Sequence, residues 1–257
     1  DLAIPSQAAP DYRFRMGSQV DVLTLVRHGA FMAILREPRW ADQQRPPPNS
    51  FDEASELHLL TREKFDWFRA AVSGLDVKAY AALTDKDFVP APPDASWSVL
   101  LTLEEEGRST LDLRKSYVGL PAERQRPLTE LRAYFIEEME LSRKDPILPQ
   151  RLVVLLESPL GKAPVFVLDD GGPGWTGGEG VSRRPASPED LRQIWKLILE
   201  ERLAFRDYAD EPLAPKDLDT RLLIQVNGYT LVDAKTRLES SSQRRRLQGL
   251  SGLLSGK

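Results

Sequence analysis

The sequence contains no cysteine, and this absence excludes several kinds of site at once. Disulfide frameworks, thiolate zinc sites, iron–sulfur clusters and thiol catalysis all need cysteine side chains. Histidine is scarce as well, because His28 and His58 are the only two in 257 residues. Any catalytic or metal-binding imidazole must therefore be one of these two.

The chain also lacks a long apolar run and a large net charge. A membrane-spanning helix needs about 20 predominantly apolar residues, and no segment approaches this length, so we expect no membrane insertion. The 35 basic and 39 acidic residues leave a formal charge of −4. No strong field therefore draws the chain toward nucleic acid or anionic lipid.

No secretory signal peptide is recognisable in the sequence. The chain begins at Asp1 rather than at methionine, which fits either a mature exported protein or a trimmed chain. We favour export and expect a periplasmic or secreted location.

The first half of the chain predicts two hairpins that alternate with two helices. Residues 1–18 show no periodicity and predict a surface arm. Residues 20–35 predict a hairpin that turns at 27–30, where Gly29 can adopt the positive φ of a tight turn. Thr61 is then a suitable N-cap for a helix that carries apolar side chains at spacings of three and four. A second hairpin is expected to turn at Glu106 and Gly107, and a second helix to cover 128–141.

The second half repeats this order. Residues 152–168 predict a third hairpin with its turn at 158–161, followed by a glycine-rich loop that contains Trp175. Ser187 and Pro188 are typical of a helix start. Asn227 and Gly228 predict a tight turn in a fourth hairpin. A last helix is expected around Leu247, Leu250 and Leu254.

The first helices of the two halves match at an offset of 126 residues. The N-cap, an acidic residue and three apolar positions all correspond, as Thr61 with Ser187, Glu63 with Glu189, Phe65 with Leu191, Phe68 with Ile194 and Val72 with Ile198. Five matches in order favour a duplicated unit. The alternative is one α+β domain whose elements alternate by accident.

We therefore predict an α+β protein built as a tandem repeat of a ββαββα unit. Its sheets should be antiparallel, because hairpins join neighbouring strands, and helices should cover one face of each. The expected organisation is an N-terminal arm at 1–18, a first repeat at 19–145 and a second repeat at 150–257.

One motif in the sequence resembles a catalytic motif. The apolar strand that ends in Arg27, His28 and Gly29 resembles the N-terminal motif of the histidine phosphatase superfamily. That resemblance implies a phosphorylated His28, with a second histidine late in the chain to hold the phosphoryl group. No histidine follows His58, and residues 31–35 predict a return strand. A hairpin turn is the favoured interpretation, and a degenerate phosphohydrolase that uses His28 is the alternative function.

Other candidate sites lack the spacing their chemistry requires. Asp169 and Asp170 do not follow the ligand pattern of a calcium loop, and residues 171–174 lack the lysine and hydroxyl residue that end a phosphate-binding loop. His58 lies between two leucines, where a packed or surface histidine is favoured over a general base. We expect no enzyme activity, no cofactor and no metal.

After these candidate sites, recognition of another protein is the remaining class of function. Trp175 and Trp40 are expected on loops, where aromatic side chains commonly anchor interfaces. The alternative for each is that it folds back onto its own domain. Trp67, Trp97 and Trp195 lie in patterned segments and are expected in the core or at its edge.

Each half also resembles the emfourin-type inhibitors of thermolysin-like metalloproteases. The segments that carry this resemblance are 23–29, 60–75 and 97–113, which are fold positions. The family's small, glycine-rich first turn is replaced here by residues 27–29 in one half and 158–161 in the other. The resemblance implies a fold and protein binding, with no site residue. The expected function is a non-enzymatic protein-binding module, either a protease inhibitor or an accessory subunit of a larger envelope assembly.

Overall fold

The computed structural model describes residues 10–17, 21–38, 56–90, 98–116, 118–158, 161–162, 165–176, 184–200, 220–236 and 250. The chain divides into two compact units, residues 1–147 and residues 148–257, which we call unit 1 and unit 2. This division falls within the short segment that separates the two predicted repeats.

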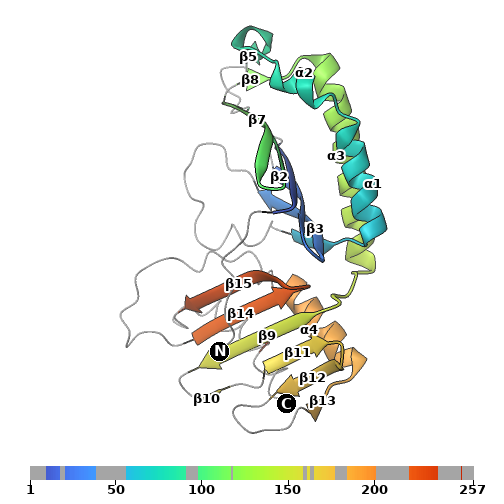
Figure 1. The fold of residues 1–257 in the computed structure, drawn as a ribbon, viewed down its shortest axis with the longest axis vertical. Coiled ribbons are helices and arrows are strands. Elements are labelled where there is room, and N and C mark those ends of the chain that lie inside the picture. Colours follow the sequence, from blue (N-terminus) through green and yellow to red (C-terminus); the bar gives the residue numbers. More distant parts are fainter. Residues whose placement is uncertain are drawn as a thin grey trace. The chain divides into compact units, whose positions relative to one another are not determined.

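Unit 1 contains a six-stranded antiparallel sheet (Figure 1). Its strands lie in the order β4-β3-β2-β1-β6-β7. Their bounds are β1 (Tyr12–Gly17), β2 (Asp21–His28), β3 (Phe31–Pro38), β4 (Glu56–Leu59), β6 (Ser98–Glu105) and β7 (Arg108–Ser116).

The prediction of an N-terminal arm at 1–18 is wrong for Tyr12–Gly17, because β1 occupies the middle of this sheet. Residues 1–9 and 18 lie outside the described residues. Strand β1 pairs with β2 on one side and with β6 on the other. Tyr12, Phe14 and Met16 are buried and alternate with the less buried Arg13 and Arg15. This alternation has the two-residue period of a strand with one buried face. The same alternation of large apolar and basic residues can be seen in the sequence of this segment.

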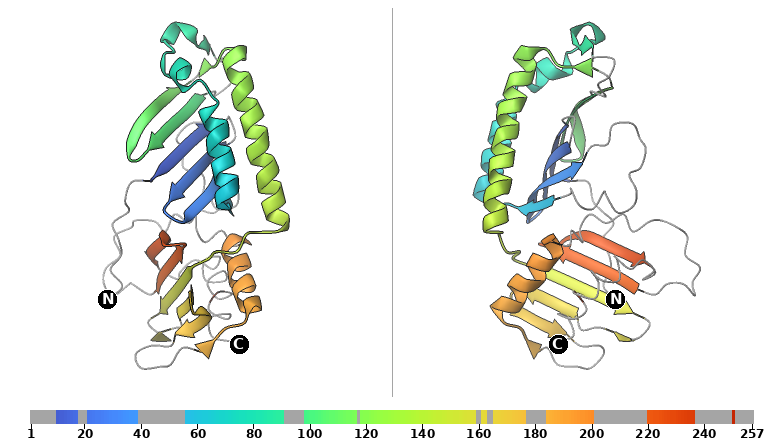
Figure 2. Two further views of the ribbon diagram at one scale, coloured as in Figure 1. Left: turned by 45° about the vertical axis from the view of Figure 1, so that its right-hand side comes forward. Right: turned by 180° about the vertical axis from the view of Figure 1, so that it is seen from behind.

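Two long helices of unit 1 cover one face of its sheet (Figure 2). Helix α1 (Arg62–Ser73) begins where predicted, because the Thr61 hydroxyl accepts a hydrogen bond from the Lys64 amide at 3.2 Å. Helix α3 (Ala122–Lys144) is longer than the predicted 128–141 and continues through Pro127. The buried apolar side chains of the two helices follow spacings of three and four residues: Phe65, Phe68 and Val72 from α1, and Leu131, Phe135 and Met139 from α3.

Three shorter elements lie between α1 and β6: α2 (Val77–Ala81), the 3-10 helix η1 (Asp85–Asp87) and β5 (Val89–Pro90). A fourth, β8 (Val118–Gly119), lies between β7 and α3. Strands β5 and β8 pair with each other in a separate two-stranded sheet.

Unit 2 contains a second antiparallel sheet, in the order β13-β12-β11-β9-β14-β15, with β10 paired to β9. The bounds are β9 (Leu152–Ser158), β10 (Gly161–Lys162), β11 (Val165–Asp169), β12 (Gly172–Thr176), β13 (Arg184–Pro185), β14 (Thr220–Val226) and β15 (Tyr229–Thr236). Helix α4 (Pro188–Glu200) starts at the predicted cap, where the Ser187 hydroxyl accepts from the Asp190 amide at 3.1 Å.

The prediction of a glycine-rich loop around Trp175 is wrong, because β12 occupies this stretch and pairs with β11. In the predicted last helix only Leu250 is described, and it is helical. Leu247, Leu254 and residues 159–160 of the predicted turn lie outside the described residues.

The two sheets share one topology, but it is not the predicted ββαββα order. If the two-residue strand β10 is set aside, four strands of the sheet precede the first long helix in each unit, and a hairpin follows it. The register agrees as well: Tyr12 is paired with Arg27 and Glu105, and Leu152 is paired with Leu168 and Val226. The hairpin β2–β3 thus corresponds to β11–β12, and not to the hairpin at 152–168 with which the repeat was expected to begin.

The hairpins β6–β7 and β14–β15 agree in detail. Both turn residues have positive φ in each, at 50° and 74° for Glu106 and Gly107 and at 51° and 85° for Asn227 and Gly228. This is the type I′ turn that matches the twist of a hairpin. Both also carry a register shift at the same distance in sequence before the turn.

Candidate functional site

Of the two tryptophans expected to bind a partner, the one that the structure describes, Trp175, is not an exposed anchor. Trp175 lies on β12 and not on a loop; its side chain is only 5% exposed and packs edge-on against Phe166, with ring centroids 4.9 Å apart. It belongs to the core of unit 2. Trp40 lies outside the described residues.

The two histidines lie on opposite faces of the unit 1 sheet. His58 is paired with Ile34, which is paired with Leu25 on the helix-covered face. His28 lies an odd number of residues beyond Leu25 on β2 and therefore faces the other side. Burial and the charge of Arg13 lower the pKa of His28. This arrangement brings no second imidazole to His28.

Other predicted motifs are engaged in local contacts. Asp169 accepts a hydrogen bond from the Gly171 amide at 2.8 Å, and Asp170 forms an ion pair with Arg151 at 3.1 Å. Within the described ranges, no group of three or more potential metal ligands occurs. Among these same residues, no helix combines the length and the apolar character that crossing a membrane would need.

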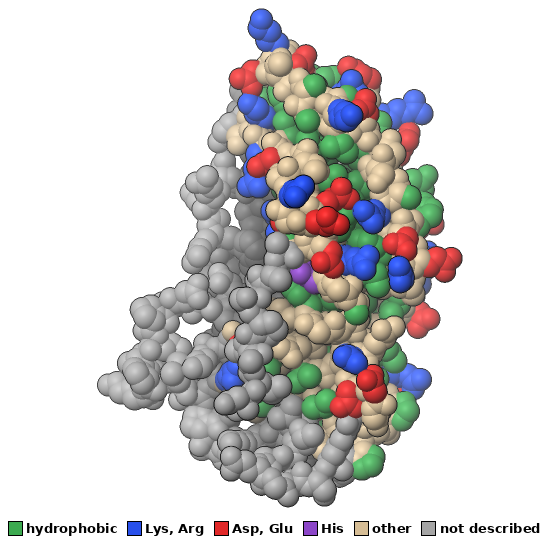
Figure 3. Space-filling view, viewed as in Figure 1, with side chains coloured by type: hydrophobic (Ala, Val, Ile, Leu, Met, Phe, Trp, Pro, Cys, Tyr) green, Lys and Arg blue, Asp and Glu red, His purple; other side chains and the backbone are tan. Residues whose placement is uncertain are grey.

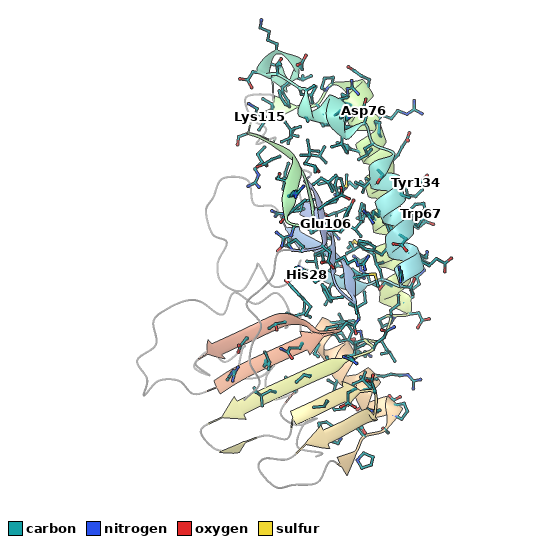
Figure 4. All side chains as sticks on the ribbon, in the orientation of Figure 1. His28, Trp67, Asp76, Glu106, Lys115 and Tyr134 are labelled. Atoms are coloured by element: carbon teal, nitrogen blue, oxygen red, sulfur yellow. The ribbon has the colours of Figure 1, made fainter. Side chains whose placement is uncertain are left out.

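An exposed aromatic pair lies on the helix layer of unit 1. Trp67 on α1 and Tyr134 on α3 are each 49% exposed, and their rings meet edge to face with centroids 5.3 Å apart. Figure 4 shows the two side chains close together on the helices. We had expected Trp67 in the core or at its edge; it is exposed because it lies off the stripe formed by Phe65, Phe68 and Val72.

The aromatic pair is held from beneath and from one side. Phe68 and Phe135 stack below it with centroids 4.7 Å apart, and Phe68 also meets the Trp67 ring edge-on at 5.0 Å. Beside it, Lys64 Nζ donates to Glu138 Oε2 at 2.7 Å and so links the two helices. The pair is therefore attached to a rigid part of the molecule.

Acidic side chains flank the aromatic pair. Glu63 precedes Trp67 by one helical turn, and Glu137 follows Tyr134 by one turn, so each lies on the same face as its aromatic neighbour. Neither forms an ion pair within the part of the chain that is described. The pKa of Lys64 is raised, first by its hydrogen bond to Glu138 and further by Glu137 and Glu63. Elsewhere on unit 1, acidic and basic side chains are interspersed (Figure 3).

A partly buried ionic network lies between α3 and the strands β2, β3 and β4. Asp21 is paired with Arg36 and with Arg132 of α3, each at 2.7 Å. Arg36 also reaches Glu56 at 3.3 Å, and Glu56 accepts from Arg143 of α3 at 2.7 Å. The network joins α3 to three strands of the sheet.

Glu56 is the most strongly perturbed carboxyl of this network. Burial alone would raise its pKa, but hydrogen bonds from His58, at 3.0 Å, and Arg143, together with the charge of Arg143, lower it to about 2. The carboxylate oxygens of Glu56 are already engaged by His58, Arg36 and Arg143. The network therefore has the character of a structural cross-link.

Comparison with known protein families, with curated proteins and with solved structures finds no match. The choice of a functional site rests on the geometry of this chain alone.

Proposed function

We propose that the chain is a non-enzymatic protein-binding protein, and that it docks a partner on the α1–α3 face of unit 1. The observation that carries this proposal is the pair of half-exposed aromatic rings, Trp67 and Tyr134. Aromatic side chains dominate the energetics of protein interfaces because they bury much apolar area with few rotatable bonds. In a helix pair that already buries its own core, two rings left in water are best explained by a partner that covers them.

Rigid support favours this role. The Phe68–Phe135 stack and the Lys64–Glu138 bond restrict the two rings before a partner arrives. Binding then orders fewer side chains, so that more of the interaction energy appears as affinity.

The acidic side chains around the two rings indicate the charge of the partner's surface. Glu63 and Glu137 supply negative potential without an ion pair of their own, and this potential also raises the pKa of Lys64. We infer a partner protein that inserts an apolar side chain between Trp67 and Tyr134 and carries lysine or arginine beside it. Leu141, also exposed, extends the apolar surface by two further helical turns along α3.

We further propose that the two units arose by tandem duplication and then diverged in function. The shared strand order, register and turn conformation support this. Counted from the N-caps Thr61 and Ser187, the position of Trp67 is occupied in unit 2 by Gln193. The aromatic pair is therefore specific to unit 1, as a docking surface acquired by one copy would be.

A photo-crosslinking experiment tests the docking surface in the native cell. A benzoylphenylalanine placed at Tyr134 should yield a discrete crosslinked protein. The same group at the exposed Val89 is the matched control and should not yield that protein. Trp67→Ala should remove the crosslink, and Glu63→Lys with Glu137→Lys should weaken it, because the partner is basic at this surface.

Crosslinking that is identical from Tyr134 and Val89, or that survives Trp67→Ala, would contradict the proposal. The resemblance to emfourin-type inhibitors names the first partner class to assay, a thermolysin-like metalloprotease. Inhibition that is lost in Trp67→Ala would assign an inhibitor, and a stable complex without inhibition would assign an accessory subunit.

A further inference from the structure

A cavity of about 520 Å³ opens at one end of the unit 1 sheet, beside α1. Its floor is a row of four residues that are paired in register across four strands, in the order Arg27, Tyr12, Glu105 and Arg108. Residues paired in this way point to the same side of a sheet. Arg69 of α1 closes the cavity from the helix side.

Tyr12, in the middle of this row, has a buried hydrogen-bond donor without an acceptor. Its side chain is only 3% exposed, yet its hydroxyl has no hydrogen-bond partner among the described residues. A buried hydroxyl without a partner is costly to the fold. Burial, and secondarily the charge of Glu105, raises the pKa of Tyr12, so the hydroxyl keeps its proton and can donate it in a hydrogen bond.

The arginines around Tyr12 differ in how fully they are paired. Arg69 lies 3.3 Å from Glu105 and stacks over the Tyr12 ring, with its Cζ 5.5 Å from the ring centroid. Arg27 is 3.9 Å from Asp11, a long contact, and its Nε donates a hydrogen bond to the Gly29 carbonyl oxygen at 3.2 Å. This bond uses one of the five N–H donors of its guanidinium group. The side chain of Arg108 makes no ion pair or hydrogen bond in the described part of the chain. The cavity thus presents one hydroxyl and two guanidinium groups with capacity to bind an acceptor.

Unit 2 shows that the fold does not require a polar corner here. The equivalent row in the same register is Leu168, Leu152, Val226 and Tyr229. At the position of Arg69, counted from the N-caps, unit 2 has Trp195, which is 1% exposed. One copy of the framework is therefore closed by an apolar side chain, whereas the other holds an open, charged cavity.

We propose that this corner cavity of unit 1 binds a carboxylate carried on an apolar group. The guanidinium groups of Arg27 and Arg108 would bind the carboxylate oxygens, and the carboxylate would be the acceptor that the buried Tyr12 hydroxyl lacks. The apolar group would lie on the side of the buried Phe65 ring. Three carboxylates, Asp11, Glu105 and Glu106, line the cavity together with the three arginines. A monoanion fits better than a dianionic phosphate, because these carboxylates repel added negative charge. The volume suits a small molecule or the last residue of a peptide.

Calorimetric titration of the whole chain tests this with N-acetyl-phenylalanine and its amide. The acid is expected to bind and the amide to bind at least tenfold more weakly. A second arm compares an acetylated hexapeptide that ends in a free phenylalanine with the same peptide amidated. Tighter binding of the free acid peptide than of the single residue identifies a chain terminus as the ligand; equal binding identifies a small acid. Absence of binding by both acids, or equal binding of acid and amide, would overturn the proposal.

Variants then locate the site. Tyr12→Phe and Arg108→Ala should each weaken binding by about tenfold, the usual loss for one hydrogen bond to a charged group. Arg114→Ala removes the same charge from the exposed side of β7 and should leave binding unchanged. The double variant Arg69→Trp with Glu105→Val places the residues of unit 2 at these two positions. The indole ring should fill the cavity and abolish binding, although the loss of Glu105 removes a repelling charge, while circular dichroism shows an intact fold.

Binding that persists in this double variant, or that is unaffected by Tyr12→Phe, would refute the assignment. The inference is independent of the proposed docking surface. Trp67→Ala should not change carboxylate affinity, so the two proposals can fail separately.

Discussion

At the scale of single residues, the ionic network of unit 1 couples its stability to pH. The pKa of Glu56 is lowered from 4.5 to about 2 by its bonds to His58 and Arg143. A carboxyl whose folded-state pKa is depressed stabilises the fold fully above its unfolded pKa. That contribution is lost as the pH falls toward the folded value. The relevant window is therefore between about pH 4.5 and pH 2.

We expect Glu56→Gln to lower the free energy of unfolding at pH 7 by at most about 3 kcal/mol, from 1.36 kcal/mol per pKa unit. Its stability should also fall less steeply than that of the wild type between pH 4.5 and pH 2. Urea unfolding at several pH values measures both effects. Glu137→Gln removes an exposed carboxylate without an ion pair and serves as the control. Equal acid sensitivity of wild type and Glu56→Gln would show that the network does not govern the acid limb.

At the scale of elements, two equivalent hairpins use the same turn with different residues. Both first turn residues adopt a left-handed φ, which is strained for Glu106 and well tolerated by Asn227. Asn227 does more than tolerate the turn, because its Oδ1 accepts from the amides of Gln150 and Arg151 at 2.8 and 3.0 Å. It thereby ties the start of unit 2 to the tip of its last described hairpin.

Exchanging the residue types at these two turn positions should therefore change the stability of the two units in opposite directions. Glu106→Asn should stabilise unit 1 by roughly 0.5 kcal/mol through relief of strain. Asn227→Glu should destabilise unit 2 by roughly 1 to 2 kcal/mol, because it adds strain and removes an acceptor for two amides. Thermal unfolding of both variants provides the measurement. A stabilising Asn227→Glu would contradict the role given to this turn.

At the scale of the whole molecule, each unit has its own sheet and its own buried side chains. Unit 1 is organised around the aromatic side chains of α1, α3 and β1, including Phe14, Phe68 and Phe135. In unit 2, Phe166, Trp175 and Trp195 are the large buried aromatic side chains among the described residues. The two units should therefore respond separately to damage in one core.

Trp195→Ala should destabilise unit 2 by roughly 3 to 5 kcal/mol, the usual cost of removing a large buried aromatic side chain. Hydrogen exchange followed by mass spectrometry should show faster exchange in β9, β11 and β14, while β1, β2 and β6 keep their protection. Trp67→Ala, on an exposed ring, is the control and should change exchange little. Equal loss of protection in both sheets would mean that the chain unfolds as one cooperative unit.

The sequence by itself determined the local elements of this protein. The caps at Thr61 and Ser187, the three-and-four spacing of apolar residues and the tight turn at Asn227 each act between near neighbours in the chain. Their structural meaning can therefore be read without the fold. The five matching helix positions likewise pointed to two related halves. The alternation of apolar and basic residues in β1 can also be seen in the sequence. It did not lead to the prediction of a strand, because the segment is short and follows two prolines.

Only the tertiary structure decided which residues act together. Trp175 was assigned to a loop because of its glycines, yet pairing with β11 makes that stretch a strand and buries the ring. Trp67 and Tyr134 meet only because α1 and α3 pack side by side. The carboxylate-binding corner joins residues of four strands whose neighbours are set by sheet order and register. These arrangements depend on contacts between distant segments, and no local pattern of residues encodes them.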